Sequence, residues 1–107
     1  MKRLTGVERD AAVSAVPQWQ LLEDEGGQLA REFQFPSFAA AFAFMAEAAL
    51  LAERNDHHPD WRNVYDRVWV KLTTHDASGL TSKDVNLAQA MDAIYARFAA
   101  APAAASD

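Results

Sequence analysis

The chain has 107 residues, a length typical of one domain, with 50% hydrophobic and 23% charged residues, and no apolar run approaches the ~20 residues of a membrane-spanning helix. A formal net charge of −5 argues against sequence-independent nucleic-acid binding, which needs a basic surface. Cysteine is absent, which excludes disulfides, thiolate metal sites and cysteine nucleophiles.

The first residues of the chain show no secretory signal. Met1, Lys2 and Arg3 begin a polar segment without an apolar core. Together with the lack of cysteine, this favours a cytoplasmic protein that contacts neither membrane nor nucleic acid.

The first predicted helix begins at Thr5. Glu8 follows three residues later, which is the spacing of a capping box. The helix is expected to end near Ala15, because Pro17 cannot continue it.

A β-hairpin is predicted next. Residues 19–22 and 29–35 favour strands, and the Glu25-Gly26-Gly27 segment favours the turn between them. Trp19 is interpreted as a core residue, since lone tryptophans usually pack in the interior.

The second predicted helix follows Ser37 and ends near Asn55 and Asp56. It carries two apolar stripes. The first, which we expect to be buried, consists of Phe38, Phe42, Met45 and Ala49. The second consists of Ala41, Phe44, Ala48 and Leu51. Because the stripes occupy different sides of a helix, we expect the second, including Ala48, to contact another subunit. The alternative is that small alanines are exposed at little cost.

A second hairpin and a third helix complete the predicted elements. Residues 61–65 and 68–73 favour strands around a turn at Asp66 and Arg67, with Val68, Val70 and Leu72 on the core face. The last helix begins at Thr81, and its predicted buried stripe is Leu87, Met91, Ile94 and Phe98.

The order helix, strand, strand, helix, strand, strand, helix predicts an α+β fold. We expect a four-stranded antiparallel sheet with three helices packed on one face. Residues 1–100 are expected to form a single domain, followed by an alanine-rich, low-complexity tail over residues 101–107 that frays.

All three histidines of the chain lie between Glu53 and Asp84. Imidazole both gives and takes protons near neutral pH, so this grouping favours proton-transfer chemistry, although a histidine near a helix end is often a cap. Pro59 favours an extended backbone at His58, so His57 and His58 can be splayed around one small ligand.

Seven positions of this stretch form a pattern: Glu53, His57, His58, Pro59, Tyr65, His75 and Asp84. The pattern resembles the signature of the pterin-4a-carbinolamine dehydratases (4a-hydroxytetrahydrobiopterin dehydratases). The flanking segments Thr74-His75-Asp76 and Gly79-Leu80-Thr81 also resemble that family. Ser78 departs from it, because the family often carries a second glycine before Gly79.

The resemblance implies a hydro-lyase that converts 4a-hydroxytetrahydropterin to quinonoid dihydropterin and water, recycling the cofactor of aromatic amino acid hydroxylases without a metal or a bound cofactor. It implies that His58 anchors the pterin and acts as base, that His57 and His75 are candidate acids, and that Glu53 and Asp84 orient them. It also implies a homodimer or a dimer of dimers. Asp84 has a second interpretation as the partner of Thr81 in a capping box, and both interpretations can hold together.

Two alternatives belong to other classes. His57, His58, His75 and a carboxylate could bind zinc or iron, although adjacent histidines converge on one metal less readily than a pair four residues apart. Members of the family are also dimerisation partners of a transcription factor, so the apolar second helix could instead serve a protein-interaction module.

Overall fold

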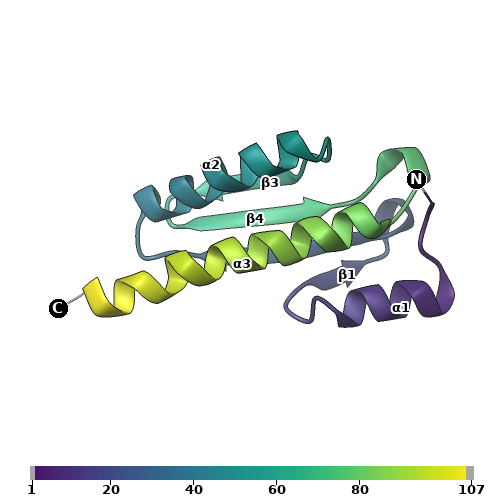
Figure 1. Cartoon of the computed structure of the whole chain (residues 1–107), viewed down its shortest axis with the longest axis horizontal. Helices are drawn as coiled ribbons and strands as arrows, with labels where there is room; N and C mark the ends of the chain where they lie inside the picture. The colour runs from purple at the N-terminus through teal and green to yellow at the C-terminus, as the bar shows by residue number, and fades with distance from the viewer. Residues whose placement is uncertain (1, 106–107) are drawn as a thin grey trace.

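The computed structural model describes residues 2–105 (Figure 1). The elements in chain order are α1 (Gly6–Ser14), β1 (Gln20–Leu22), β2 (Gln28–Gln34), α2 (Phe38–Arg54), β3 (Asp60–Val64), β4 (Arg67–Leu72) and α3 (Ser82–Ala105), with single 3-10 turns η1 (Asp24–Gly26) and η2 (His75–Ala77). This is the predicted order. No described helix is both long and apolar enough to cross a membrane.

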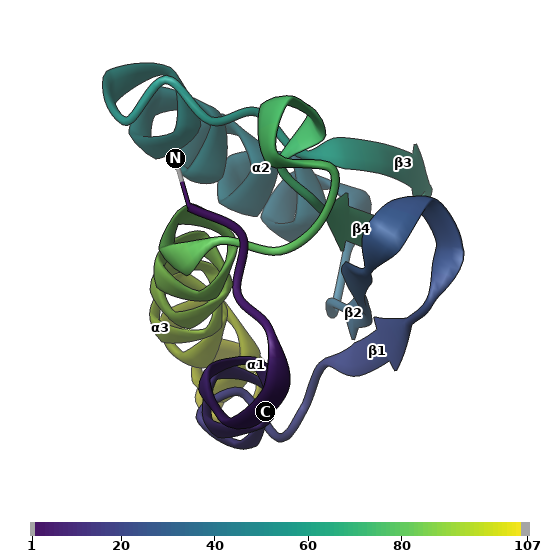
Figure 2. The ribbon, with the colours of Figure 1, turned by 90° about the vertical axis from the view of Figure 1, so that its right-hand side faces the viewer.

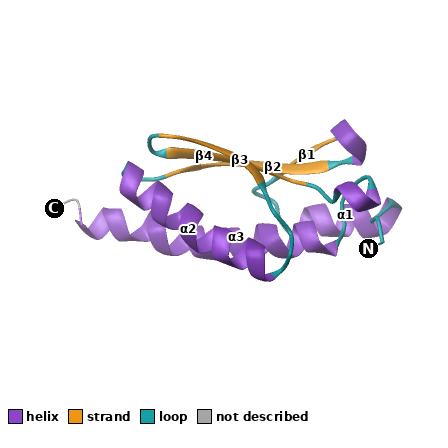
Figure 3. Ribbon diagram, turned by 90° about the horizontal axis from the view of Figure 1, so that it is seen from above, coloured by secondary structure: helices purple, strands orange, loops and turns teal. Residues whose placement is uncertain are grey.

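The four strands form one antiparallel sheet in the order β1-β2-β4-β3. The two hairpins join through β2 and β4, where Leu29 pairs with Leu72 and Phe33 with Val68. Seen from above, the strands lie on one side and the helices on the other, and the end-on view also places α1, α2 and α3 on the same face (Figures 2 and 3). The predicted α+β architecture is therefore confirmed.

The core lies between the sheet and the helices. Its central ring is Phe33, which is fully buried and packs against the rings of Trp19, Phe44 and Tyr95 at centroid distances of 4.8 to 5.8 Å. Trp19 is buried as predicted, and its indole nitrogen donates to Asp92 at 2.8 Å. Six of the predicted core positions of β4 and α3 are also buried: Val68, Val70, Leu72, Leu87, Met91 and Ile94. Phe98, the last position of the predicted α3 stripe, is partly buried against this core.

The prediction of which face of α2 is buried was wrong. The buried residues of α2 are Ala41, Phe44, Ala48 and Ala52, whereas Phe38 and Phe42 are 49% and 58% exposed. Alanines at the contact let α2 pack closely against α3 and β4. Ala48 therefore lies in the core of one subunit and cannot contact a second.

Three local details differ from the predictions. Thr5 precedes α1 but its side chain makes no capping hydrogen bond, so the capping box with Glu8 is not formed. The second hairpin turns one residue early, because Tyr65 takes a left-handed φ of 51° and Arg67 already belongs to β4. α3 continues to Ala105, so part of the tail expected to fray is helical, while residues 106–107 lie outside the described residues.

The loop between β1 and β2 and the loop between β4 and α3 are in close backbone contact at the end of the sheet where β4 finishes. A Cβ atom added to Gly26 would lie 1.8 Å from the carbonyl oxygen of Ser78, and one added to Gly79 would lie 2.8 Å from that of Gly26. Only glycine permits this backbone approach. Ser78 has a left-handed φ of 57°, so the turn forms without the second glycine that the family often carries.

We predict that Gly26→Ala lowers the free energy of unfolding by more than Gly6→Ala does. Both glycines have left-handed φ values, 84° and 55°, so each variant should carry a backbone strain of about 1 to 2 kcal/mol. Only Gly26 also meets a backbone atom, because nothing lies within 4 Å of a Cβ at Gly6. Thermal unfolding followed by circular dichroism checks this, and equal losses of stability would contradict the close contact.

Candidate active site

The histidines meet where α2 ends, β4 ends and α3 begins, at the right of Figure 1. α2 stops because Asp56 adopts a left-handed φ of 52°, and the backbone nitrogen of His57 then donates to Ala52 at 3.0 Å. Because the backbone changes direction at Asp56, the neighbouring side chains of His57 and His58 reach different partners, Asp84 and Glu53. His75 opens η2, which follows β4 after Thr73 and Thr74.

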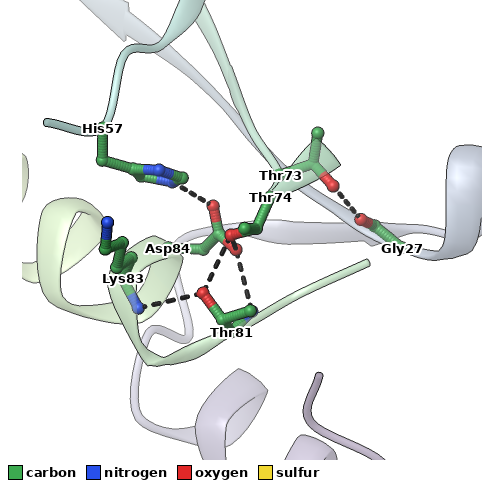
Figure 4. Close-up of polar contacts among 7 residues, drawn as sticks. All are labelled: Gly27, His57, Thr73, Thr74, Thr81, Lys83 and Asp84. Carbon is green, nitrogen blue, oxygen red and sulfur yellow. Dashed lines mark hydrogen bonds and ion pairs between the residues drawn. The ribbon is translucent and has the colours of Figure 1, made fainter. Parts of the chain in front are cut away.

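His57 is the buried histidine of the site. Only 8% of the residue is exposed, and its Nε2 lies 2.6 Å from Oδ1 of the fully buried Asp84 (Figure 4). The other carboxylate oxygen, Oδ2, accepts from the backbone nitrogen of Thr81 at 2.9 Å and from Oγ1 of Thr74 at 2.8 Å. Asp84 therefore caps α3 and contacts His57 at the same time, as the two interpretations of this residue allowed.

His58 and His75 are much more exposed. The side chain of His58 is 59% exposed, and its Nε2 lies 2.9 Å from Oε1 of Glu53. The side chain of His75 is 81% exposed, and its Nδ1 lies 3.8 Å from Oε1 of Glu25 in η1. The approach of Glu25 was not predicted, because it depends on how the first hairpin packs against η2.

The three histidines line one open cavity of about 310 Å³, near the lower end of the range that holds small ligands. Its lining residues are Asp56, His57, His58, Thr73, Thr74, His75, Asp76 and Lys83. Glu53 and Asp84 do not line it and instead contact histidines that do. No role was predicted for Lys83 or Thr74, although both adjoin residues of the recognised pattern.

Tyr65 lies away from this cavity although it belongs to the recognised pattern. It occupies the turn at the far end of the β3–β4 hairpin and is 66% exposed. The length of β3 separates it from His58 and Pro59. Within one subunit, Tyr65 thus shapes the hairpin and does not contact the histidines.

The geometry gives no support to the metal alternative. Within residues 2–105, no group of three or more histidine, cysteine, aspartate or glutamate side chains is placed to hold a metal ion. Nε2 of His57 already contacts Asp84, and His58 and His75 contact different glutamates.

Comparison with known proteins places this arrangement in context. The family model described as "Pterin 4 alpha carbinolamine dehydratase" matches residues 2–94. A Rhodopseudomonas palustris (strain BisB18) protein named "Putative pterin-4-alpha-carbinolamine dehydratase" is 53% identical over 97 residues, covering 91% of this chain and 95% of that protein. A protein of the same name from Novosphingobium aromaticivorans is 52% identical over 90 residues, covering 84% and 93%.

A solved structure has the same fold. It is described as "Crystal structure of transcriptional coactivator/pterin dehydratase from Brucella Melitensis" and matches with a TM-score of 0.83 and 45% sequence identity. The match covers 88% of this chain and 99% of that chain.

We predict that His57→Ala destabilises the fold and that His75→Ala does not. Removing His57 takes a hydrogen-bond partner from the buried carboxylate of Asp84, which typically costs about 1 to 3 kcal/mol. His75 is exposed and lies beyond hydrogen-bond distance of Glu25, so its loss should stay within about 0.5 kcal/mol. Urea unfolding of the two variants measures both values, and equal stabilities would contradict a structural role for His57.

Proposed function

The chain belongs to the pterin-4a-carbinolamine dehydratase family, and we propose that it converts 4a-hydroxytetrahydropterin to quinonoid dihydropterin and water. In this role it would recycle the cofactor left by an aromatic amino acid hydroxylase. The observation that carries the proposal is the convergence of three histidines on one cavity, each with a carboxylate nearby.

The reaction requires two proton transfers on one ring system. A proton is delivered to the 4a-hydroxyl as the carbon–oxygen bond breaks and water leaves, and another is removed from the ring nitrogen beside it. Imidazoles can do both near neutral pH. His57 and His58 lie in the segment after α2 and His75 in η2, so the proposed proton donors and acceptors would approach the substrate from two parts of the chain.

We assign His58 to anchoring the pterin and to the role of base, with His57 and His75 as the acids. Glu53 would orient His58, since Glu53 Oε1 and His58 Nε2 lie 2.9 Å apart. Asp84 would orient His57, since Asp84 Oδ1 and His57 Nε2 lie 2.6 Å apart. In this proposal the side chains of His57, His58 and His75 supply all of the acid and base groups.

The purified protein, without added metal, should accelerate loss of the 4a-carbinolamine that a pterin-dependent hydroxylase generates. His58→Ala should lose the most activity, because the two acids can partly replace each other while the anchor has no substitute. Each loss is expected within the ~10² to 10⁴-fold range of a general acid or base. Absorbance of the carbinolamine over time measures the rate.

Two results would contradict this mechanism. Stoichiometric zinc or iron in the purified protein, with activity abolished by a chelator, would refute the metal-free reaction. Equal losses in His57→Ala, His58→Ala and His75→Ala would refute the division of roles among the histidines.

We further propose that a second copy of the chain covers the exposed face of α2. Phe38 and Phe42 lie on this face with ring centroids 6.0 Å apart, and about half of each residue is exposed. Adjacent exposed aromatic rings are typical of protein contacts. Homo-oligomers are commonly symmetric, so the same face would meet its own copy. The alternative partner is a different protein, since the Brucella relative is described as a transcriptional coactivator as well as a pterin dehydratase.

Phe42→Glu should convert the assembled protein to monomers while leaving the fold intact, because the side chain is exposed within one subunit. Sedimentation velocity and circular dichroism measure the two properties. Ala48→Glu is the contrasting variant and should unfold the chain, because it buries a charge in the core. An unmodified protein that sediments as an 11.8 kDa monomer at micromolar concentration would overturn the self-association and favour a different partner.

A further inference from the structure

We infer that Thr74 is a positioning residue, and that it determines which nitrogen of His57 faces the substrate. Its effect on turnover rests on the proposed function, whereas its effect on His57 can be observed in the free protein. A chain of hydrogen bonds behind the cavity connects the two residues (Figure 4). From the sequence we expected only the cap between Asp84 and Thr81 and a contact of Asp84 with a histidine.

The chain of bonds is continuous and shielded from solvent. The backbone nitrogen of Lys83 donates to Thr81 Oγ1 at 3.3 Å, and Thr81 Oγ1 lies 2.8 Å from Thr74 Oγ1. Thr74 Oγ1 lies 2.8 Å from Asp84 Oδ2, and Asp84 Oδ1 lies 2.6 Å from His57 Nε2. Thr81 and Asp84 are fully buried, and Thr74 and His57 are each 8% exposed.

The direction of each bond follows from the donors available. A carboxylate oxygen accepts hydrogen bonds and does not donate them, and Oδ2 of Asp84 accepts from the backbone nitrogen of Thr81 at 2.9 Å. The hydroxyl of Thr74 must therefore donate to Asp84. Because a hydroxyl has one hydrogen, Thr74 then accepts from Thr81. On the other carboxylate oxygen, the same reasoning makes Nε2 of His57 the donor.

The consequence is that His57 exchanges protons with substrate through Nδ1. Nε2 carries its hydrogen towards Asp84 in both the neutral and the protonated ring. Within the described residues, Nδ1 has no hydrogen-bond partner, yet it is not among the fully buried unpaired atoms, so it keeps contact with solvent. His57 itself lines the cavity.

Thr74 is held rigidly enough to act in this way. Its backbone nitrogen donates to Gly79 at 3.0 Å and its backbone oxygen accepts from Gly79 at 3.3 Å, which closes the turn that contains His75. With its backbone fixed, its hydroxyl holds one oxygen of Asp84 and leaves the other oriented towards His57. Thr81 cannot serve as the test position, because it also caps α3.

The test compares Thr74→Val, which removes the hydroxyl at nearly constant shape, with Thr74→Ser, which keeps it. Nitrogen-15 NMR of the free protein distinguishes a protonated from an unprotonated ring nitrogen, and spectra of His58→Ala and His75→Ala assign the His57 signals by elimination. We expect the hydrogen of neutral His57 on Nε2 in the wild type and in Thr74→Ser. In Thr74→Val the nitrogen-15 chemical shifts of Nδ1 and Nε2 of His57 should become partly averaged, because the hydrogen then occupies both nitrogens. The variant should also show a fall in kcat of about 10-fold and little change in KM.

Thr73→Val is the matched control. It removes the hydroxyl of the residue next to Thr74. This hydroxyl donates to the backbone oxygen of Gly27, also at 2.8 Å, and makes no bond to Asp84. Its His57 nitrogen signals should match those of the wild type. A shift in Thr73→Val as large as that in Thr74→Val would show a general loosening of this segment and overturn the inference.

Two further results would overturn it. One is a wild-type spectrum with the hydrogen of neutral His57 on Nδ1, a result that does not depend on any variant folding. The other is a Thr74→Val spectrum identical to that of the wild type. Failure of the proposed dehydratase function would have a different signature, because the wild type would then lack turnover while its His57 signals kept the expected pattern.

Discussion

The buried carboxylate of Asp84 is the constraint on which the arrangement of the site depends. A buried charge is tolerated only when hydrogen bonds replace its lost water. Asp84 obtains them from three parts of the chain: Thr81 at the start of α3, Thr74 in the segment after β4, and His57 in the segment after α2. The same bonds that allow the charge to be buried therefore hold these three segments together, and they bring His57 to the cavity.

The fold separates the site from the other notable surface of the molecule. The helices on one face of the sheet bury the aromatic core, and the loops at one end of the sheet form the cavity. α2 contributes to all three regions, since Phe44 packs in the core, Phe42 lies exposed, and the helix ends just before His57. A second subunit could therefore contact the exposed face of α2 without altering the cavity beyond the C-terminal end of that helix.

Much of the fold could be predicted from the sequence, because element order follows from local signals such as the alternation of Val68, Val70 and Leu72. The cap formed by Asp84 was likewise a local signal. The buried face of α2 could not be predicted, because phenylalanines and alanines occur on both stripes and only packing distance selects between them. The approach of Glu25 to His75 depends on tertiary structure, since the two residues lie fifty positions apart in the chain. The bond from Thr74 to Asp84 has the same origin.

The three histidines differ in how firmly they are held, and this difference gives physical content to their proposed roles. His57 is fixed by a buried carboxylate, so the nitrogen that we propose exchanges protons would need little reorganisation when a proton moves. His58 and His75 are exposed, and exposed pairs with glutamate contribute little to holding a side chain. They can adjust to an entering ring, at the cost of ordering when it binds. One rigidly held histidine beside two adaptable ones would suit the proposed reaction, in which one small ring must be both recognised and protonated.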